Sequence, residues 1–330
     1  MKSNYSKILF LIRKVLKRNS LVYKIYGYIQ CNKVLRQYKM IVNQYNKKKT
    51  TYDNIKLLKK NGIDRQWISS VSNDRKVKIF WVGNGEHQDR SGFLQSLSKI
   101  ALVDVFCNET EYGQFWNHRP YELDKKIIQS SKLYKDIKNL KQNPDILLMQ
   151  TWGFRIDVNV IRRIKKDFGC KVINIGMDEK HTYWVNGVPE DGTYGLKDVI
   201  DIMLTSIPVA IDWFRKENVP CFFFPEASDS NFFFPIDTDK KYDIGLVGEN
   251  YGIRTEIVEI LQKQGFNIKV YGDGWPSGRI SPNLINEFYN QCKIVLGVGT
   301  IGYCNNLFSL KLRDFDVPMS GAFYLTTFCE

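Results

Sequence analysis

The chain has 330 residues, of which 43% are hydrophobic, so it is long and apolar enough for one large domain or two of ordinary size. Its net charge of +13 is confined to the N-terminal segment, because residues 1–60 hold 16 Lys and Arg and one acid, whereas the rest of the chain holds 32 and 34. A nucleic-acid-binding fold carries basic residues on the face that binds, so this distribution argues against a nucleic-acid partner and for a basic segment that meets an anionic membrane surface.

The cysteines and the N-terminal apolar run bear on the compartment. The seven cysteines include no Cys-x-x-Cys pair, so neither a disulfide framework nor a zinc site is expected, and reduced cysteines are typical of the cytoplasm. The apolar run Ile8–Ile12 ends at Arg13 and Lys14, which is too short for a membrane span or a signal-peptide core. We expect a cytoplasmic protein that is at most peripheral at the inner face of the membrane.

Residues 1–65 have the pattern of helices. Apolar residues recur at spacings of three and four with Lys and Arg on the other face, as in Ile8, Leu11, Ile12, Val15 and Leu16. Such a helix either lies on anionic lipid, where each cation contributes roughly 1 kcal/mol, or packs as a solvated helix on the body of the protein. We assign residues 1–75 to a basic helical N-terminal segment, with residues 1–60 as the candidate membrane contact.

The body of the chain alternates strands with helices. Apolar strands are expected at residues 77–82, 101–107, 144–152, 170–179 and 198–206, with helices between them, one of which starts at about Ser91. This alternation predicts βαβ units and a parallel sheet that is covered on both faces. We therefore expect a Rossmann-like domain over residues 76–221.

A second block of the same kind follows. It opens with "YDIGLVGENYGIRTEIVEIL", which gives a strand, a glycine-containing loop and a helix, and continues to a strand that ends in Tyr271-Gly272. The openings of the two blocks are alike, and Gly83 and Gly248 are 165 residues apart, which suits two Rossmann-like domains in tandem. We assign the Pro-, Asp- and Ser-rich residues 222–241 to a linker and residues 242–330 to the second domain.

Ligands of open α/β sheets bind beyond the carboxyl ends of the strands, so the loops at these ends are the candidate sites. Neither glycine-rich loop completes the G-x-G-x-x-G fingerprint and no Walker motif is present, which disfavours an NAD-dependent enzyme. No carboxylate or histidine cluster has metal-ligand spacing, so we predict no metal and no other cofactor.

Four polar residues follow predicted strands of the first domain. His87 and His181 lie on loops at the carboxyl end of the sheet, and Asp178 and Glu179 come directly after a strand. Such groups serve as a general base or orient a sugar hydroxyl, but a loop histidine is often a surface residue and an acid there is often a helix N-cap. We take Asp178 and His87 as candidate catalytic residues.

The stretch "KLRDFDVPMSG" (311–321) is densely charged just before a strand. In a helix or turn that faces the cleft, Lys311 and Arg313 would neutralise a nucleoside diphosphate, and Arg254 at the start of a helix would add to this. Asp316 would accept hydrogen bonds from a ribose diol. The same charges also fit a salt-bridged helix face.

Four segments resemble, in order and spacing, the CgeB-like (spore-maturation type) branch of the group 1 glycosyltransferases, which have the GT-B fold. They are "YDIGLVGENYGIRTEIVEIL", "VYGDGW", "CKIVLGVG" and "KLRDFDVPMSGAFYLTT", and the resemblance covers about residues 222–329. It implies a metal-independent, hexosyltransferase-type enzyme that moves a sugar from a nucleotide-sugar donor to a glycan or lipid-linked acceptor in surface polysaccharide biosynthesis.

The resemblance also assigns donor-binding roles. Asp316 stands where the family has the glutamate that binds the ribose of the donor, and Phe308 replaces the first acid of the related two-glutamate pattern. We expect the donor site to comprise Gly248, Arg254, Tyr271, Gly272, Trp275, Ser309, Lys311, Arg313 and Asp316.

The family pattern continues past Glu330 with a further loop, strand and helices, so we expect that the C-terminal part of the donor domain is missing from this sequence. A donor domain that ended there would lack part of the cover of its sheet. The alternative function is therefore a non-catalytic nucleotide- or sugar-binding protein on the same GT-B scaffold, which would bind a nucleotide without sugar turnover.

Overall fold

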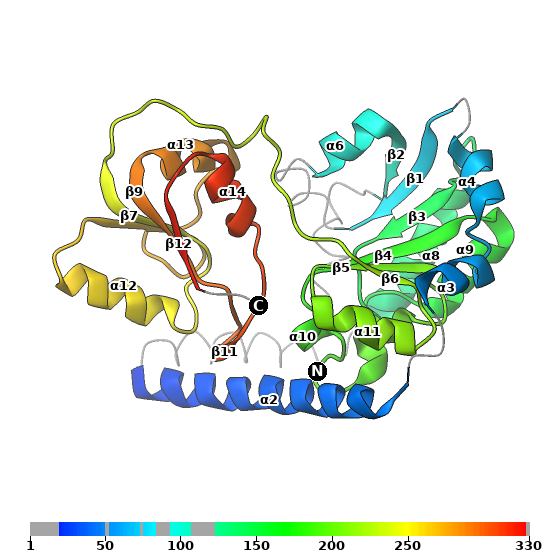
Figure 1. The fold of residues 1–330 in the computed structure, drawn as a ribbon, viewed down its shortest axis with the longest axis horizontal. Helices are drawn as coiled ribbons and strands as arrows, with labels where there is room; N and C mark the ends of the chain where they lie inside the picture. The colour runs from blue at the N-terminus through cyan, green and yellow to red at the C-terminus, as the bar shows by residue number, and fades with distance from the viewer. Residues whose placement is uncertain (1–19, 50–52, 73–74, 84–92, 107–122, 328–330) are drawn as a thin grey trace.

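The computed structural model describes residues 20–49, 53–72, 75–83, 93–106 and 123–327. It contains two α/β domains that lie side by side, with one long helix running along both (Figure 1). Each domain is built on a parallel sheet, as the alternation of strands and helices predicted, so the expected α/β fold with two Rossmann-like domains and an N-terminal helical extension is confirmed.

The first sheet has the strand order β2-β1-β3-β4-β5-β6, and all neighbouring strands are parallel. Its strands are β1 (Val77–Val82), β2 (Ala101–Val105), β3 (Ile146–Met149), β4 (Lys171–Gly176), β5 (Ile202–Thr205) and β6 (Cys221–Phe223). The helices of this domain are α6 (Phe93–Ile100), α8 (Leu123–Lys138), α9 (Val158–Phe168), α10 (Glu179–Thr182) and α11 (Pro208–Lys216), with 3-10 turns η1 (Pro189–Asp191) and η2 (Thr193–Leu196).

Strand β6 moves one boundary expected from the sequence. Phe222 and Phe223, which we had assigned to the linker, pair with β5 and belong to the first sheet. Several expected strands are also shorter in the structure, since the segments 144–152, 170–179 and 198–206 include turns and the start of α10 in addition to the paired residues. Apolar residues continue past the ends of these strands because the loops there are buried too, as Ile207 shows.

The second sheet has the order β12-β9-β7-β8, again with all neighbours parallel. Its strands are β7 (Tyr242–Val247), β8 (Ile268–Tyr271), β9 (Cys292–Gly297) and β12 (Tyr324–Thr326). The helices are α12 (Arg254–Lys263), α13 (Ile285–Asn290) and α14 (Arg313–Met319), with a 3-10 turn η3 (Pro282–Leu284). A short antiparallel hairpin, β10 (Thr300–Ile301) and β11 (Cys304–Phe308), was not expected from the sequence.

The two sheets share one topology. In each, the first strand lies between the second and the third, so the strand order reverses between β1 and β3 in one domain and between β7 and β9 in the other. The loops that leave such a pair of strands go to opposite faces of the sheet and leave a crevice at its carboxyl end. This topology places the candidate ligand site of the second domain at the end of β7 and β9.

The N-terminal helices are α2 (Ser20–Lys47), α3 (Asn54–Lys60) and α4 (Arg65–Ser72). Helix α2 is anchored to the first domain near its C-terminus, where Tyr45 donates to Glu217 at 2.6 Å and accepts from the Tyr183 hydroxyl at 2.7 Å. Two turns earlier, Tyr38 packs near Trp213, with ring centroids 6.1 Å apart. These aromatic contacts make α2 part of the main core of the first domain.

The N-terminal half of α2 contacts the second domain. Apolar residues between Cys31 and Tyr38, in the middle of the helix, pack against Ile301, Cys304 and Leu307 of the β10–β11 hairpin. At the tip of the hairpin, the ring of Tyr303 makes edge contacts with Tyr23 and Tyr26. A single helix therefore connects the two domains on the side opposite the linker. None of the described helices combines the length and apolar character that a transmembrane span requires.

Candidate functional site

Arg254 closes the crevice at the end of β7 and β9. It is the first residue of α12 and is only 4% exposed. Its guanidinium donates to the carbonyl of Glu249 at 2.9 Å and to that of Val298 at 3.1 Å, so it ties together the loops that follow the two strands. The predicted donor residue thus has a positioning role, and its Nε, which is buried and without a partner, remains available.

Arg313 lies beside Arg254 at the same loop. A Cβ built on Gly248 would be 3.1 Å from one terminal nitrogen of Arg313 and 3.2 Å from one of Arg254, so both guanidinium groups flank the backbone of Gly248. Burial and the neighbouring Arg313 lower the pKa of Arg254. The Nε of Arg313 is also buried and unpartnered. Two adjacent cations with free donors, at a helix N-terminus, form a site that an anionic ligand would satisfy.

Three further predicted donor-binding residues contribute to the packing around the loop of Gly248. Trp275 donates its indole N–H to the carbonyl of Gly248 at 2.8 Å. Gly272 has φ of +140°, and a Cβ there would lie 2.1 Å from the Gly248 oxygen, so only glycine fits. The ring of Tyr271 packs edge-on against Phe288, with centroids 5.0 Å apart. These side chains shape the crevice and are engaged in packing.

Asp316 and Ser309 bring two unsatisfied polar atoms to the edge of the second domain. Asp316 is 7% exposed, and one of its carboxylate oxygens is buried without a partner. Burial raises the pKa of Asp316 to about 7, although the nearby Ser228 and Arg313 act in the opposite direction. The hydroxyl of Ser309 is likewise buried and unpaired. Buried polar atoms normally have partners, so these two indicate a place that a polar ligand completes.

Lys311 reaches across to the first domain. Its ammonium donates to Asp178 at 3.1 Å, and neighbouring Lys180 donates to the carbonyl of Phe308 at 2.6 Å, so two lysines bridge the domains in opposite directions. Burial acts to raise the pKa of Asp178, but Lys311 and His181 lower it overall. Asp178 occupies the N-cap position of α10 without making a capping hydrogen bond. Its carboxylate is therefore directed to the interdomain contact.

The structure separates Lys311 from Arg313, which the sequence had grouped around one diphosphate. Helix α14 begins at Arg313, and the carboxylate of Asp314 accepts from the backbone N–H of Lys311 at 2.6 Å and from the hydroxyl of Tyr324 at 2.7 Å. This arrangement turns Lys311 toward Asp178 and Arg313 toward Gly248. The charged stretch consequently supplies a cation to each side of the cleft.

The linker contributes residues that sequence reasoning missed. Burial and the nearby carboxylate of Asp178 raise the pKa of Glu226 to about 8, and one oxygen of its carboxylate is buried without a partner. The hydroxyl of Ser228 lies next to Asp316. The available signal was that Glu226 follows directly on the apolar run "FFFP". Charged residues are rarely buried, so an acid within an apolar segment is a candidate for a functional carboxylate.

Histidines occur on both predicted loops of the first domain. His181 lies close enough to Asp178 to lower the pKa of that carboxyl, and its Nδ1 is buried without a partner. Burial lowers the pKa of His181, although the carboxylate of Asp178 acts in the opposite direction. His87, the other candidate, lies outside the described residues. In the part of the chain that is described, no group of three or more His, Cys, Asp or Glu side chains is placed to hold a metal ion.

Glu179 is fully buried beneath Asp178. It accepts from the hydroxyl of Thr205 at 2.6 Å, and burial raises its pKa to about 7. Glycine at position 176 leaves the space for this carboxyl, since a Cβ there would lie 1.7 Å from its oxygen and 2.5 Å from the Cε of Met203. The end of β4 is thus built around Glu179, the residue that follows Asp178.

Replacement of Gly176 by alanine is expected to lower the free energy of unfolding by about 1–3 kcal/mol, because the added methyl group overpacks this site. Urea denaturation measures the change. The carboxyl clash accounts for the loss if the same replacement costs less in a Glu179→Ala background. Equal costs in the two backgrounds would assign the loss to another contact.

A family model matches part of the second domain. Residues 254–327 match a family model described as glycosyl transferase-like. All the predicted donor-binding residues except Gly248 lie within the match. The second domain therefore carries a glycosyltransferase-like segment, and glycosyl transfer implies a sugar donor and an acceptor. The chain matched no curated protein.

Proposed function

We propose that this chain transfers a hexose from a nucleotide-sugar donor to a glycan or lipid-linked acceptor, and that it belongs to the CgeB-like branch of the group 1 glycosyltransferases. The observation that carries the proposal is the pair of guanidinium groups of Arg254 and Arg313 around Gly248, at the switch point of the glycosyltransferase-like domain. Ligands bind α/β sheets at this point, and an adjacent pair of arginines fits a diphosphate.

The remaining site residues fit the other parts of the donor and acceptor. Asp316, with its unpaired carboxylate oxygen, accepts hydrogen bonds from the ribose diol. Asp178 lies across the cleft and is held by Lys311. In the transfer, a hydroxyl oxygen of the acceptor bonds to the anomeric carbon of the donor, and the bond from that carbon to the diphosphate breaks.

The site provides for both the leaving diphosphate and the proton of the acceptor hydroxyl. The nucleoside diphosphate leaves with the bonding electron pair, and Arg313 stabilises the negative charge that develops on it. The acceptor loses its hydroxyl proton to Asp178, whose carboxylate oxygen is near the cleft and ionised because its pKa is lowered. Since protein cations face the diphosphate, we propose that the transfer is independent of a metal.

The proposed cellular setting follows from the charge of the N-terminal segment. The basic residues of this segment would hold a cytoplasmic enzyme at the inner face of the membrane by attraction to anionic lipids. Surface polysaccharides are assembled on lipid carriers there, so polysaccharide biosynthesis is the process we propose.

A thermal-shift series with UDP, GDP, CDP, ADP and the corresponding sugar nucleotides tests donor binding. We expect one nucleoside diphosphate to raise the melting temperature by about 5 °C at 100 times its dissociation constant, because it binds the folded state alone. The same series on Lys293→Ala, which changes an exposed cation of the second domain, should give the same shift.

Turnover separates the transferase from a non-catalytic binder. The matching sugar nucleotide should be consumed when a phospholipid-linked or glycan acceptor is added. A nucleotide that binds without being consumed with either acceptor would favour the binding protein, and no shift with any nucleotide would contradict both functions.

A further inference from the structure

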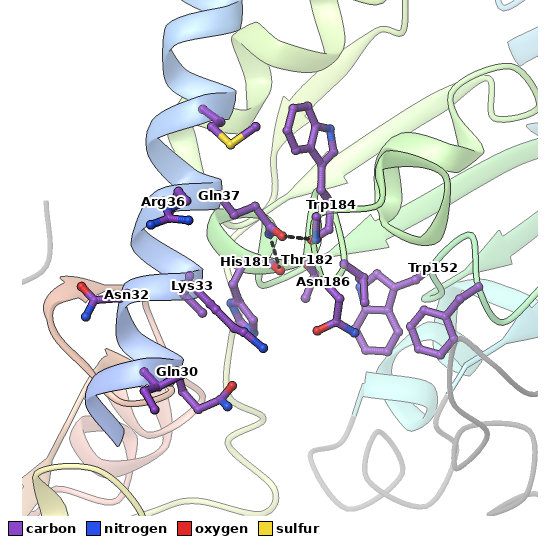
Figure 2. Close-up of a pocket in the computed structure, with 16 residues that line it drawn as sticks. Gln30, Asn32, Lys33, Arg36, Gln37, Trp152, His181, Thr182, Trp184 and Asn186 are labelled. Atoms are coloured by element: carbon purple, nitrogen blue, oxygen red, sulfur yellow. Dashed lines mark hydrogen bonds between the residues drawn. The ribbon is translucent and has the colours of Figure 1, made fainter. Parts of the chain in front are cut away.

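A groove of about 700 Å³ lies between α2 and the segment that follows β4 (Figure 2). One wall is the helix, and the other is formed by α10 and the residues after it, with Trp152 beyond. Phe154 also lines the groove. The two walls are fastened by Gln37, whose amide donates to the carbonyls of His181 at 3.2 Å and Trp184 at 2.8 Å. The groove therefore lies at an interface between α2 and the first domain that hydrogen bonds hold together.

Much of the groove is apolar. The rings of Trp152 and Phe154 are stacked with centroids 5.8 Å apart, and Trp184 adds a third aromatic side chain. On the helix, Ile29 and Met40 belong to the lining but are 48% and 55% exposed. Exposed apolar side chains beside an aromatic wall are expected where an apolar ligand covers them.

Two exposed cations give the groove a polar part. Lys33 and Arg36 are exposed on α2 and line it, and none of the described lining residues is an acid. In addition, the indole nitrogen of Trp184 and the hydroxyl of Thr182 are buried without partners, and these residues are only 7% and 9% exposed. Lys33 and Arg36 thus present cations to the groove, which complement an anion such as a phosphate, whereas the two unpartnered atoms are buried in its wall.

The groove leads to the proposed reaction centre. His181 lines it, and the backbone N–H of His181 donates to the carbonyl of Asp178 at 2.9 Å. Asp178 is in turn bonded to Lys311 of the second domain. A ligand in the groove therefore has one end beside the residues that we place around the acceptor hydroxyl.

We propose that this groove binds the acceptor, and that the acceptor is a glycolipid whose sugar is joined to a hydrocarbon chain through a phosphate. The chain lies against Trp152, Phe154 and Met40, the phosphate meets Lys33 and Arg36, and the sugar is directed to His181 and Asp178. That the bound lipid is the acceptor rests on the proposed function. That the groove binds a lipid phosphate is argued from the residues of the groove alone.

Binding of dodecyl phosphate to the full chain, below its micellar concentration, tests the proposal. Titration calorimetry gives the affinity, and tryptophan fluorescence reports on Trp152 and Trp184 in the groove. The double variant Lys33→Glu/Arg36→Glu is compared with Lys24→Glu/Lys39→Glu, which makes the same change of charge at exposed positions of α2 that do not line the groove. Dodecyl maltoside and inorganic phosphate serve as the uncharged and the chain-free probes.

We expect dodecyl phosphate to bind more tightly than either of these probes. The groove variant should weaken its binding about tenfold or more, and the control variant should leave the affinity within about twofold. Equal weakening by both variants would show diffuse attraction to the helix and overturn the proposal. Equal affinity for dodecyl maltoside would do the same, because the cations would then have no role.

Nucleotide binding, measured in parallel, separates this proposal from the function on which it rests. A wild-type chain that binds a nucleoside diphosphate but no dodecyl phosphate would overturn the proposed lipid-phosphate site and remain consistent with the transferase function. A chain that binds dodecyl phosphate in the way described but no nucleotide would support the lipid-phosphate site and overturn the transferase.

Discussion

Replacement of Arg313 by alanine is expected to reduce sugar transfer by about 10²–10³-fold, the usual effect of removing one preorganised donor to a developing negative charge. The reason lies in its position, because its guanidinium flanks Gly248 together with that of Arg254. The hydrogen bonds of Arg254 to two backbone carbonyls remain in the variant, so the fold of the loop is retained. Steady-state kinetics with the donor identified by thermal shift measures the loss.

Two comparison variants make this result specific. Lys293→Ala removes an exposed cation of the same domain that pairs with Asp243, and it should keep full activity. Lys311→Ala should impair transfer but spare nucleotide binding, since Lys311 bonds to Asp178 and not to the loop of Gly248. Undiminished turnover in Arg313→Ala, with a normal melting temperature, would contradict the proposed role of Arg313 in the donor site.

Replacement of Asp316 by asparagine is expected to stabilise the protein at pH 8 and to weaken nucleotide binding at the same time. Burial raises the pKa of Asp316 from its ordinary value of 3.8 to about 7, so the folded chain keeps a proton that the unfolded chain has released. The corresponding stability is present below the unfolded pKa and is lost as the pH rises through about 7. Asparagine has no charge to bury, so it removes this loss.

The expected gain at pH 8 is on the order of 2–4 kcal/mol and disappears toward pH 4, where the carboxyl is protonated in both states. Urea denaturation at pH 4, 6 and 8 measures it. Glu179, whose pKa is also raised by burial, is common to both proteins and cancels in the difference. The charge of Asp316 contributes to the raised pKa of Glu226, so relief of Glu226 is part of the expected gain. Asp243→Asn is the control, because its pKa is lowered by the hydrogen bond from Lys293 and no gain is expected.

The loss of binding has a separate cause. A carboxylate accepts two hydrogen bonds from a ribose diol, whereas the amide of asparagine offers one acceptor and a donor, so the affinity should fall about tenfold. Isothermal titration at pH 8 checks this. A variant that is more stable and binds as tightly as the wild type would show that Asp316 is a buried acid without a role in the donor site.

Parts of this architecture could be predicted because they depend on local patterns. Alternating apolar strands and helices gave both parallel sheets, and the glycine loops marked their carboxyl ends. The charged stretch before the last strand predicted that cations and an acid of the second domain face the cleft, and this stays a prediction. The local pattern could not predict where the side chains point. Lys311 and Arg313 are two residues apart, yet Lys311 contacts Asp178 of the first domain and Arg313 lies beside Gly248 of the second.

The remainder depends on contacts between distant segments. The β10–β11 hairpin has no strong strand signal, and it is stabilised by packing against α2, more than 260 residues earlier in the chain, as the contact of Cys304 with the carbonyl of Cys31 shows. Glu226 and Ser228 belong to a linker by composition but lie at the interdomain contact. The groove depends on where α2 lies, which its own amphipathic pattern does not specify.

The course of α2 limits how such a protein can be recombined. Its C-terminal half is fitted to the first domain through Tyr45, and its N-terminal half to the second through the pocket of tyrosine rings around Tyr303. Gly27 belongs to the same fit, because a Cβ there would lie 3.2 Å from the Tyr303 ring. A chimera that exchanges either domain with a related protein would inherit a helix matched to only one partner. New donor specificities would therefore be transplanted most readily as loops of the second domain, with the hairpin and the helix kept as an unbroken set.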